Sequence, residues 1–575
     1  MTDAFAAKPR HSREFRLRRF LNWFPMGLTY AFLYMARYNL TVSKTALGEM
    51  MSKADFGIIF AAGTFTYAFA FLINGPLTDK IGGKKAILIG AAGAAIANAM
   101  MGTIIYGILM LNWTLNLTLV FSILYALNMY FQSYGAVAIV KVNSAWFHIR
   151  ERGVFGGIFG ILISLGLYFA FDWGESIVRG TKTIAPRLNM VEQLLRSLIG
   201  ATSASIDQTW WVFFIPAIIL AIFFIIEAFL LRDQPSQAGF ADFETGDASA
   251  GEMDRKFNLK EILVKILTNP IILTIAFIEF CSGVMRNGIM HWYKIFSNDM
   301  GYAAGFLFDR NWGLLLMLAG VLGGIFSGII SDKIFGSRRG PVAALLYGLM
   351  LVSTIVMFPF VMQSNKNIKQ EITVRVNCNL VTQNAKLGDV SLENIKAKLG
   401  SSYLIVGDDL KVTDRDTLSI LTIKSLPGKQ SKMLATKVRD ILLAEYDYFN
   451  KFQNRYEKRE IKIKNVAQVI GIRSDKIAYM LGFIVVFISL CVIGVHGMLS
   501  GTATMDFGGR RAAATAVGLI DGFVYLGTGV QSLSLGFLTE QSWNYWPPFL
   551  IPFAIIGLVL AIRIWYAFPH AKRKK

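Results

Sequence analysis

Charged residues are scarce in this chain. Only 17% of its 575 residues are Asp, Glu, Lys or Arg, whereas roughly a quarter would be usual in a soluble domain. Hydrophobic residues make up 54% of the sequence, and its mean hydropathy is positive. This composition excludes an ordinary soluble globular protein and favours a protein that lies within a membrane.

Several chemical signatures are missing as well. There are three cysteines, of which Cys281 and Cys491 lie in apolar runs and Cys378 stands alone, so no disulfide framework is expected. The basic N-terminal segment leads into a run too long for the core of a signal peptide, so no cleavable leader is expected. The sequence carries no Walker-type phosphate loop, no nucleophile triad and no cluster of metal ligands. We therefore expect no enzyme activity, no cofactor and no metal ion.

Positive charge, by contrast, is plentiful, with a formal net charge of +20. Much of the excess lies in short loops beside apolar runs, where Lys and Arg orient membrane proteins with those loops in the cytoplasm. We therefore expect no nucleic-acid partner, and a multi-pass protein of the cell inner membrane with both termini in the cytoplasm. The basic loops carry Lys80, Lys84, Lys85, Lys141, Arg150, Arg152, Lys333, Arg338, Arg339, Arg510, Arg511 and the tail Lys572–Lys575.

Twelve apolar runs of about 20 residues recur along the chain, each long enough to cross a bilayer. Only a helix or a closed barrel satisfies the backbone in lipid, and runs of this length indicate helices. The sequence therefore predicts an all-α membrane protein. The predicted spans cover residues 20–43, 56–77, 86–110, 115–140, 153–174, 209–231, 270–296, 311–332, 341–362, 477–499, 513–537 and 547–568.

The two halves of the chain repeat each other. Gly75–Lys85 (GPLTDKIGGKK) follows the second run and Gly328–Arg338 (GIISDKIFGSR) follows the eighth, at an offset of 253 residues. A parallel repeat of two six-helix halves is the architecture of major facilitator transporters, whose substrate site lies near the midplane between the halves. The aspartates of the repeated loops, Asp79 and Asp332, can meet a basic partner or a helix N-terminus, so we expect them to act in gating.

These features divide the chain into five parts. A first six-helix half (1–231) is followed by a polar cytoplasmic linker (232–269) and by helices seven to nine (270–362). An insertion (363–475) then precedes helices ten to twelve and a cytoplasmic tail (476–575).

The insertion alternates strand-like and helical stretches. Their order, β-α-β-β-α-β, predicts an inserted α+β domain of the ferredoxin-like type, which follows span nine and so lies outside the cytoplasm. It is either a passive accessory domain or one that binds or senses, with an extracytoplasmic protein partner as one possibility. The strand-like runs are Glu371–Val376, Tyr403–Val406, Leu418–Lys424 and Glu460–Val469, and the helical ones are Leu392–Leu399 and Ser431–Tyr446.

Two arginines, Arg37 and Arg286, lie inside apolar runs at matched positions of the two halves, 249 residues apart. An arginine at the centre of a membrane helix costs about 2.5–3.5 kcal/mol on insertion scales. A guanidinium stays charged and binds phosphate oxygens through paired, charge-assisted hydrogen bonds, so the two suit a dianionic phosphate. The alternative is that each arginine pairs with a structural carboxylate, for which Glu279 and Asp521 are candidates.

Other polar residues lie near the arginines or at the ends of runs. Tyr30 and Tyr34 share a helical face with Arg37, seven and three residues before it, and are expected to line the site. His496 is either a packed histidine or a site residue, and Lys141 is either substrate-facing or a cytoplasmic flank. The acidic residues that close the fifth run, Asp172 and Glu175, are expected to face water outside.

The chain resembles the organophosphate:phosphate antiporter family, which includes bacterial glycerol-3-phosphate and hexose-phosphate transporters. The resemblance covers the twelve runs but not the insertion. It implies that Arg37 and Arg286 hold phosphate, that Tyr30, Tyr34 and Tyr67 line the site, and that an ester is exchanged for inorganic phosphate by rocker-switch alternating access. It is carried by Tyr30–Arg37, Phe131–Gly153, Arg232–Gly239, Arg286, Ser331–Gly340 and Ile493–His496.

Two positions depart from that family. Where the glycerol-phosphate transporters have a lysine in the second helix, this chain has Phe71, and where they have a histidine in the fifth it has Ile163. The basic residue of the fourth helix is retained in type as Lys141. A site with fewer cations favours a different ester, or a bulkier or less charged ligand.

Together these features predict a secondary transporter of organic phosphate esters that acts as a monomer in the lipid bilayer. Its small-molecule partners would be an ester and inorganic phosphate. One alternative is a membrane sensor of a phosphorylated sugar, because such family members exist and the external domain would suit that role. Another is a proton-coupled transporter of a different anion, with coupling through Glu279 or Asp521.

Overall fold

We describe the fold from a computed structural model of the chain. In the strands and in residues 504–519 only the backbone is described. The described residues are 11–148, 151, 161–162, 164–182, 188–201, 206–243, 268, 270–300, 306–336, 338–366, 371–378, 403–412, 417–425, 461–464, 475–499 and 504–566.

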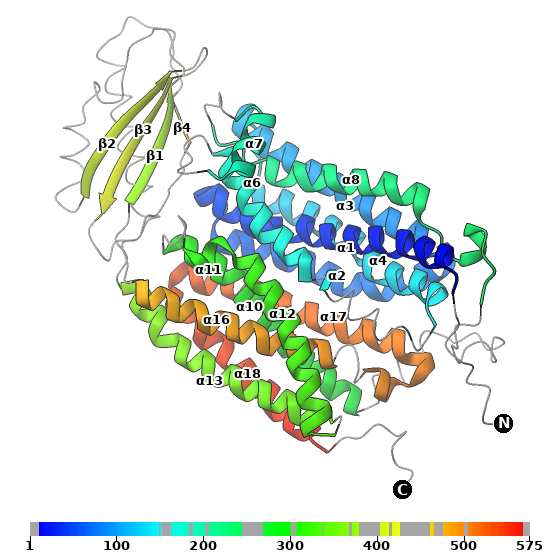
Figure 1. Ribbon diagram of the computed structural model, residues 1–575. Coiled ribbons are helices and arrows are strands. Elements are labelled where there is room, and N and C mark those ends of the chain that lie inside the picture. Colours follow the sequence, from blue (N-terminus) through cyan, green and yellow to red (C-terminus); the bar gives the residue numbers. More distant parts are fainter. Residues whose placement is uncertain are drawn as a thin grey trace, which may run out of the picture.

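Long helices run beside one another in two groups, one from each half of the chain (Figure 1). The first group consists of α1 (Arg13–Leu47), α2 (Lys53–Ile81), α3 (Gly83–Met110), α4 (Leu117–Trp146), a π-helical segment (Phe169–Trp173) that continues into α6 (Gly174–Thr181), and α8 (Trp211–Leu230). The second consists of α10 (Pro270–Asp299), α12 (Trp312–Ile329), α13 (Arg339–Lys366), α16 (Asp475–His496), α17 (Thr504–Gln541) and α18 (Trp546–Arg563). Two short helices, α7 (Met190–Leu198) and α11 (Leu307–Arg310), lie between longer ones.

Nine helices in the described part of the chain are long and apolar enough to cross a membrane, and they coincide with nine of the twelve predicted spans. Two further spans fall on α1 and α17, which have 35 and 38 residues but carry polar residues such as Arg37 and Asp521. The remaining span, 153–174, lies partly outside the described residues. Twelve crossings therefore stay a prediction.

Local sequence explains where several helices begin. The Ser52 hydroxyl accepts a hydrogen bond from the backbone N–H of Asp55, and the Asp55 carboxylate accepts one from the backbone N–H of Ser52, so this reciprocal cap starts α2. Asn116 caps α4 with a single hydrogen bond, which its side-chain oxygen accepts from the backbone N–H of Leu119. Beyond the caps the backbone groups bond within each helix, which is the arrangement that lipid requires because it offers no partner of its own.

The two ends of the bundle differ. α1 begins and α18 ends at one end, whereas the strands lie beyond the other (Figure 1). We call the first the basic end, because the end of α2, the start of α3 and the start of α13 bring Lys80, Lys84 and Arg339 there. We call the second the strand end.

The strands of the insertion form one antiparallel sheet. They are β1 (Glu371–Cys378), β2 (Tyr403–Val412), β3 (Thr417–Ser425) and β4 (Ile461–Lys464), in the order β2-β3-β1-β4. This is the strand order of a ferredoxin-like domain, with the fourth strand beside the first. The predicted helices at 392–399 and 431–446 lie outside the described residues, so the complete domain stays a prediction.

The halves approach each other most closely where glycine allows it. α2 packs along α17, and a Cβ added at Gly57 would lie 2.5 Å from the backbone oxygen of Ser532. Likewise α10 packs along α17 within the second half, where a Cβ at Gly283 would clash with the backbone oxygen of Val524. α17 therefore stands between α2 and α10, next to both predicted arginines.

Candidate functional site

Arg37 is a fully buried cation of α1 whose hydrogen-bond partners are all neutral. Its Nε donates to Oε1 of Gln132 at 2.9 Å, Nη1 donates to the phenol oxygen of Tyr525 at 2.8 Å, and Nη2 donates to that of Tyr67 at 3.1 Å. Tyr525 belongs to α17, so this hydrogen bond joins the two halves of the chain. Among the described residues, Arg37 forms no ion pair with a carboxylate.

Four tyrosine rings surround the Arg37 guanidinium. Its Cζ lies 4.9 Å from the ring centre of Tyr34, 5.9 Å from that of Tyr38, 4.5 Å from that of Tyr67 and 5.9 Å from that of Tyr525. A cation over an aromatic face is stabilised by roughly 0.5–2 kcal/mol. These rings hold the arginine in place without removing its charge.

The remaining predicted tyrosine, Tyr30, extends this group along α1. Its ring centre lies 5.5 Å from that of Tyr34, and only 7% of its surface is exposed. The expectation that Tyr30, Tyr34 and Tyr67 lie beside Arg37 agrees with this geometry. Five side chains make up this group, and we call the group as a whole the tyrosine ring: Tyr30, Tyr34, Tyr38, Tyr67 and Tyr525.

An amide network behind the site orients Gln132. Nε2 of Gln132 donates to Oδ1 of Asn128 at 2.9 Å, and Nδ2 of Asn128 donates to the backbone oxygen of Ala36 at 3.0 Å. The Gln132 amide is thereby turned so that its oxygen, an acceptor, faces Arg37. Tyr125 adds a hydrogen bond to the Arg37 backbone oxygen at 3.1 Å.

Arg286, on α10 of the second half, interacts electrostatically with three members of the same tyrosine ring. Tyr34, Tyr38 and Tyr525 are within electrostatic range of its guanidinium, and the same three lie around Arg37. Its Nε is buried without a hydrogen-bond partner. Within the described residues no side chain accepts a hydrogen bond from Arg286, so its donors are available to a ligand.

The two candidate carboxylate partners take different positions. Glu279, fully buried, has its Oε2 2.8 Å from Nδ1 of His496 and therefore contacts the histidine rather than either arginine. His496 therefore contacts Glu279 at the end of α16, and whether it also contacts a ligand stays a prediction. Asp521 lies one turn before Tyr525 on α17.

Lys141 and the two loop aspartates lie at the basic end rather than in the tyrosine ring. Nζ of Lys141 is 2.8 Å from Oδ1 of Asp79, and both side chains are well exposed. Asp332 lies 3.5 Å from Nη1 of Arg339. Each aspartate therefore pairs with a basic side chain, as expected. The structure does not bring Lys141 to the arginines.

One of the two departures from the resembled family packs directly on the tyrosine ring. The ring centre of Phe71 is 4.7 Å from that of Tyr67 and 6.3 Å from that of Tyr525. An apolar side chain therefore borders the site where those transporters have a cation. The other departure, Ile163, lies outside the described residues.

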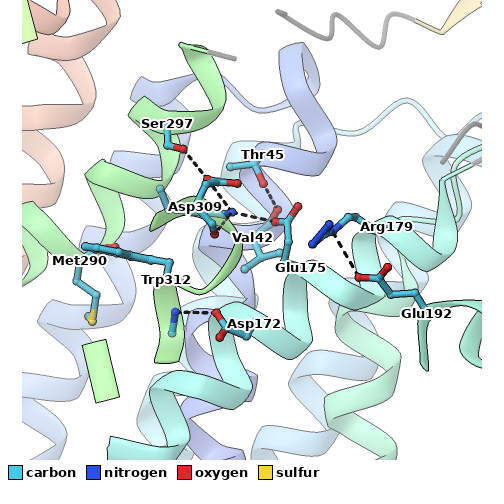
Figure 2. Close-up of polar contacts among 12 residues, drawn as sticks. Val42, Thr45, Asp172, Glu175, Arg179, Glu192, Met290, Ser297, Asp309 and Trp312 are labelled. Atoms are coloured by element: carbon cyan, nitrogen blue, oxygen red, sulfur yellow. Dashed lines mark hydrogen bonds and ion pairs between the residues drawn. The ribbon is translucent and has the colours of Figure 1, made fainter. Parts of the chain in front are cut away.

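A second buried cation, Lys294, joins the two halves nearer the strand end. Its Nζ lies 3.2 Å from Oε2 of Glu175, which belongs to α6 of the first half. It also lies 3.0 Å from Oδ1 of Asp309, which belongs to α11 of the second half. Figure 2 shows Glu175 and Asp309 side by side, with Asp172 at the start of α12. Asp172 accepts from the backbone of Gly313 at 2.7 Å and of Leu314 at 3.1 Å.

The expectation that Asp172 and Glu175 face outside water is therefore wrong. The Glu175 side chain is 13% exposed, and Asp172 caps a helix of the other half. The π-helical segment that carries Asp172 packs against both α1 and α12, so Asp172 reaches the backbone N–H groups at the start of α12. Glu175, at the start of α6, contacts the buried Lys294 of α10. Sequence position at the end of a run could not show these partners.

Sequence reasoning also missed Tyr38, Gln132 and Tyr525 as members of the site. Tyr38 follows Arg37 directly, and Gln132 lies in a segment that carries the family resemblance. Both could therefore have been predicted from the sequence. Tyr525 could not, because it approaches Arg37 only through the packing of α17 against α2.

Comparisons with known proteins agree with this architecture. The family model described as "Major Facilitator Superfamily" matches residues 26–179 and 188–368. The chain is 25% identical over 364 residues to a glycerol-3-phosphate transporter of Bacillus subtilis, covering 60% of this chain and 71% of the relative. It is 24% identical over 375 residues to the membrane sensor protein UhpC of Escherichia coli, covering 63% and 75%.

A solved structure supports the fold alone. The inward-facing, occupied structure of a bacterial homologue of the human lysosomal transporter Spinster superposes with a TM-score of 0.56 at 10% identity, covering 97% of this chain and 98% of that one. The two helical groups, the family match and these relatives agree, and they confirm the expected transporter fold in place of an enzyme. The chain belongs to the Major Facilitator Superfamily of multi-pass membrane transporters.

Proposed function

We propose that this protein is a secondary transporter of organic phosphate esters in the cell inner membrane. The observation that carries the proposal is the pair of arginines, one from each half, that share a tyrosine ring and form no ion pair with a carboxylate among the described residues. A phosphate dianion would supply both missing charges and accept hydrogen bonds from both guanidinium groups. The similarity to a glycerol-3-phosphate transporter supports this ligand class.

We further propose that the ester is exchanged for inorganic phosphate by alternating access, with the basic end in the cytoplasm. Because each half contributes one arginine, a bound phosphate would draw the halves together around it. Contacts between the halves at the strand end, including Lys53 Nζ to Oδ2 of Asp299 at 2.9 Å, fit a state closed on that side. Opening there would require these contacts and the Lys294 contacts to separate.

Counterflow in proteoliposomes tests the proposal. Vesicles loaded with inorganic phosphate should take up labelled phosphate, and external esters of different size should compete with it. Phe71 beside the tyrosine ring leads us to expect esters with a larger or less charged organic part than glycerol phosphate to compete best. Absence of phosphate-dependent flux from a folded protein would overturn the proposal.

A second candidate function is sensing, favoured by the similarity to a membrane sensor protein. A sensor would bind a phosphate ester at the same arginines without sustained exchange. Saturable binding of an ester to the purified protein, together with no counterflow, would favour sensing over transport.

A further inference from the structure

Three cations, which we call the cation cluster, meet at the end of α8, on the basic end of the bundle. α8 packs against both α1 and α3, and this packing brings the cations together (Figure 1). Arg18 of α1 donates from Nη2 to the backbone oxygen of Leu230. Lys84 of α3 donates from Nζ to the backbone oxygen of Ala228 at 2.7 Å. Arg232, which follows α8, donates from Nη1 to two carbonyl oxygens of the same helix end at 2.8 Å each.

The cation cluster carries more positive charge than a helix end needs. The C-terminus of a helix is equivalent to roughly half a negative charge, so one cation is enough to balance it. Arg232 acts electrostatically on both Arg18 and Lys84, which means that the three like charges repel one another. Within the described part of the chain, none of the three forms an ion pair with a carboxylate. A further anion would therefore stabilise the cluster.

Asp233, the acidic side chain that acts on Lys84, already serves another helix. Its Oδ1 accepts a hydrogen bond from the backbone N–H of Lys84 at 2.6 Å, in the first turn of α3. A carboxylate at this position compensates the positive end of the α3 dipole. Even with Asp233 counted, the cluster keeps an excess of two positive charges.

Buried neighbours hold the cluster in a fixed geometry. The backbone N–H of Arg232 donates to Oδ1 of Asn22 at 2.8 Å, and its carbonyl oxygen accepts from Nδ2 of Asn22 at 3.1 Å and from Nε1 of Trp146 at 3.0 Å. Cζ of Arg18 lies 5.8 Å from the centre of the Trp146 ring. Nη1 of Arg18 is buried and has no hydrogen-bond partner among the described residues. The site is therefore preformed and keeps an unused donor.

Apolar side chains on the surface border the cluster. They are large and exposed, up to 60% on α1 and 74% on α8, and they comprise Leu17, Phe20, Leu21, Phe229 and Leu230. The first predicted span begins at residue 20 and the sixth ends at residue 231, so the cations lie where the hydrocarbon of a bilayer meets its headgroups. A soluble anion would gain nothing from this surface, whereas acyl chains would cover it and remove it from water.

We propose that the cation cluster binds the phosphate group of an anionic phospholipid, whose acyl chains lie along the exposed apolar side chains of α1 and α8. Basic pockets between membrane helices bind such headgroups. The lipid phosphate would supply the missing counter-charge and accept a hydrogen bond from Nη1 of Arg18. The cluster shares no residue with the tyrosine ring, so the inference does not depend on the proposed function.

Lipid titration of the purified protein tests the proposal. The delipidated protein in detergent is mixed with increasing phosphatidylglycerol or phosphatidylcholine, and native mass spectrometry counts the lipids that stay bound. The parent should bind phosphatidylglycerol in preference to phosphatidylcholine. Arg18→Gln and Arg232→Gln should each weaken phosphatidylglycerol binding by about fivefold, and the double variant should lose most of the preference. Glutamine keeps a donor for the α8 carbonyl oxygens, so the helix end should be retained.

Lys141→Gln is the matched control. It also removes one positive charge from the basic end, but this charge is paired with Asp79, so phosphatidylglycerol binding should equal that of the parent. Arg18→Lys keeps the charge and should bind close to the parent. Thermal unfolding without added lipid shows whether each variant is folded, and if the double variant is not, the folded single variants decide.

Two results would overturn the assignment of a lipid site. One is phosphatidylglycerol binding that Arg18→Gln and Arg232→Gln leave unchanged. The other is an equal loss in Lys141→Gln, which would indicate general attraction to the basic end. In a second arm, inorganic phosphate is added to the parent with its bound lipid. Retention of phosphatidylglycerol supports the proposal, whereas its displacement would show that the cluster is a site for a soluble anion instead.

Discussion

Two cations of one helix, α10, lie in opposite surroundings. Lys294 contacts two carboxylates, Glu175 at 3.2 Å and Asp309 at 3.0 Å, whereas Arg286, eight residues earlier, has a buried Nε with no partner. The Lys294 charge is thus balanced within the protein and ties the halves together near the strand end. The hydrogen-bond partners of Arg37 are neutral, and we propose that the charges of both arginines are balanced by a bound anion. Whether a buried cation serves the fold or a ligand follows from whether the protein supplies its counter-charge.

The largest effect should come from removing Lys294. Lys294→Met leaves two carboxylates buried without their cation, and breaking such a pair costs about 3–5 kcal/mol of unfolding free energy. Thermal unfolding of the purified protein in detergent measures it. Arg286→Met is the matched variant on the same helix, and it should cost far less because none of the described side chains accepts a hydrogen bond from Arg286.

A triple variant sharpens this comparison. Adding Glu175→Gln and Asp309→Asn to Lys294→Met removes the unpaired charges, so most of the lost stability should return. If Lys294→Met and Arg286→Met were equally destabilising, the distinction between the two cations would be wrong.

The next largest effect concerns exchange rather than stability. Arg37→Lys and Arg286→Lys keep the charge but lose the two-pronged geometry, and one lost charge-assisted hydrogen bond is worth about 1.5–3 kcal/mol. Phosphate counterflow should therefore fall by roughly ten- to a hundredfold, with unfolding temperatures retained. Arg339→Lys at the basic end serves as the control, and normal counterflow in both site variants would contradict the phosphate-binding role.

A smaller effect is expected at the cap of α12. Asp172→Ala removes the acceptor for the backbone N–H groups of Gly313 and Leu314, and loss of such a cap costs about 1 kcal/mol. Asp172→Asn retains one acceptor and should lose less. Equal unfolding temperatures for the parent and the alanine variant would show that Asp172 does not hold α12.

The smallest effect should follow changes to the exposed pair of Lys141 and Asp79. An exposed ion pair contributes about 0–1 kcal/mol, so Lys141→Ala and Asp79→Ala should hardly change stability. Because Lys141 contacts Asp79 rather than the tyrosine ring, phosphate affinity should stay within about twofold of the parent. A much larger loss of affinity in Lys141→Ala alone would return Lys141 to the binding site.

Much of the site could be predicted from local features of the chain. Arg37 and Arg286 stand out because a charge in an apolar run is rare, and the repeat makes them a pair. Tyr30 and Tyr34 follow from helical spacing on the same face as Arg37. Tyr525 and Lys294 could not be assigned in this way, because their roles depend on helices from distant parts of the chain.

The length of the apolar runs and the repeat of the halves can be seen in the order of residues along the chain. They were enough to predict a membrane protein and its superfamily. Which charges find partners is a property of distance between helices. That distance depends on close approaches such as the one at Gly283, where the absence of a side chain lets α10 reach α17. Packing of this kind gave Lys294 two carboxylates, gave Glu279 a histidine, and gave Arg37 neutral hydrogen-bond partners. The electrostatic character of the site therefore emerged only once the helices were assembled.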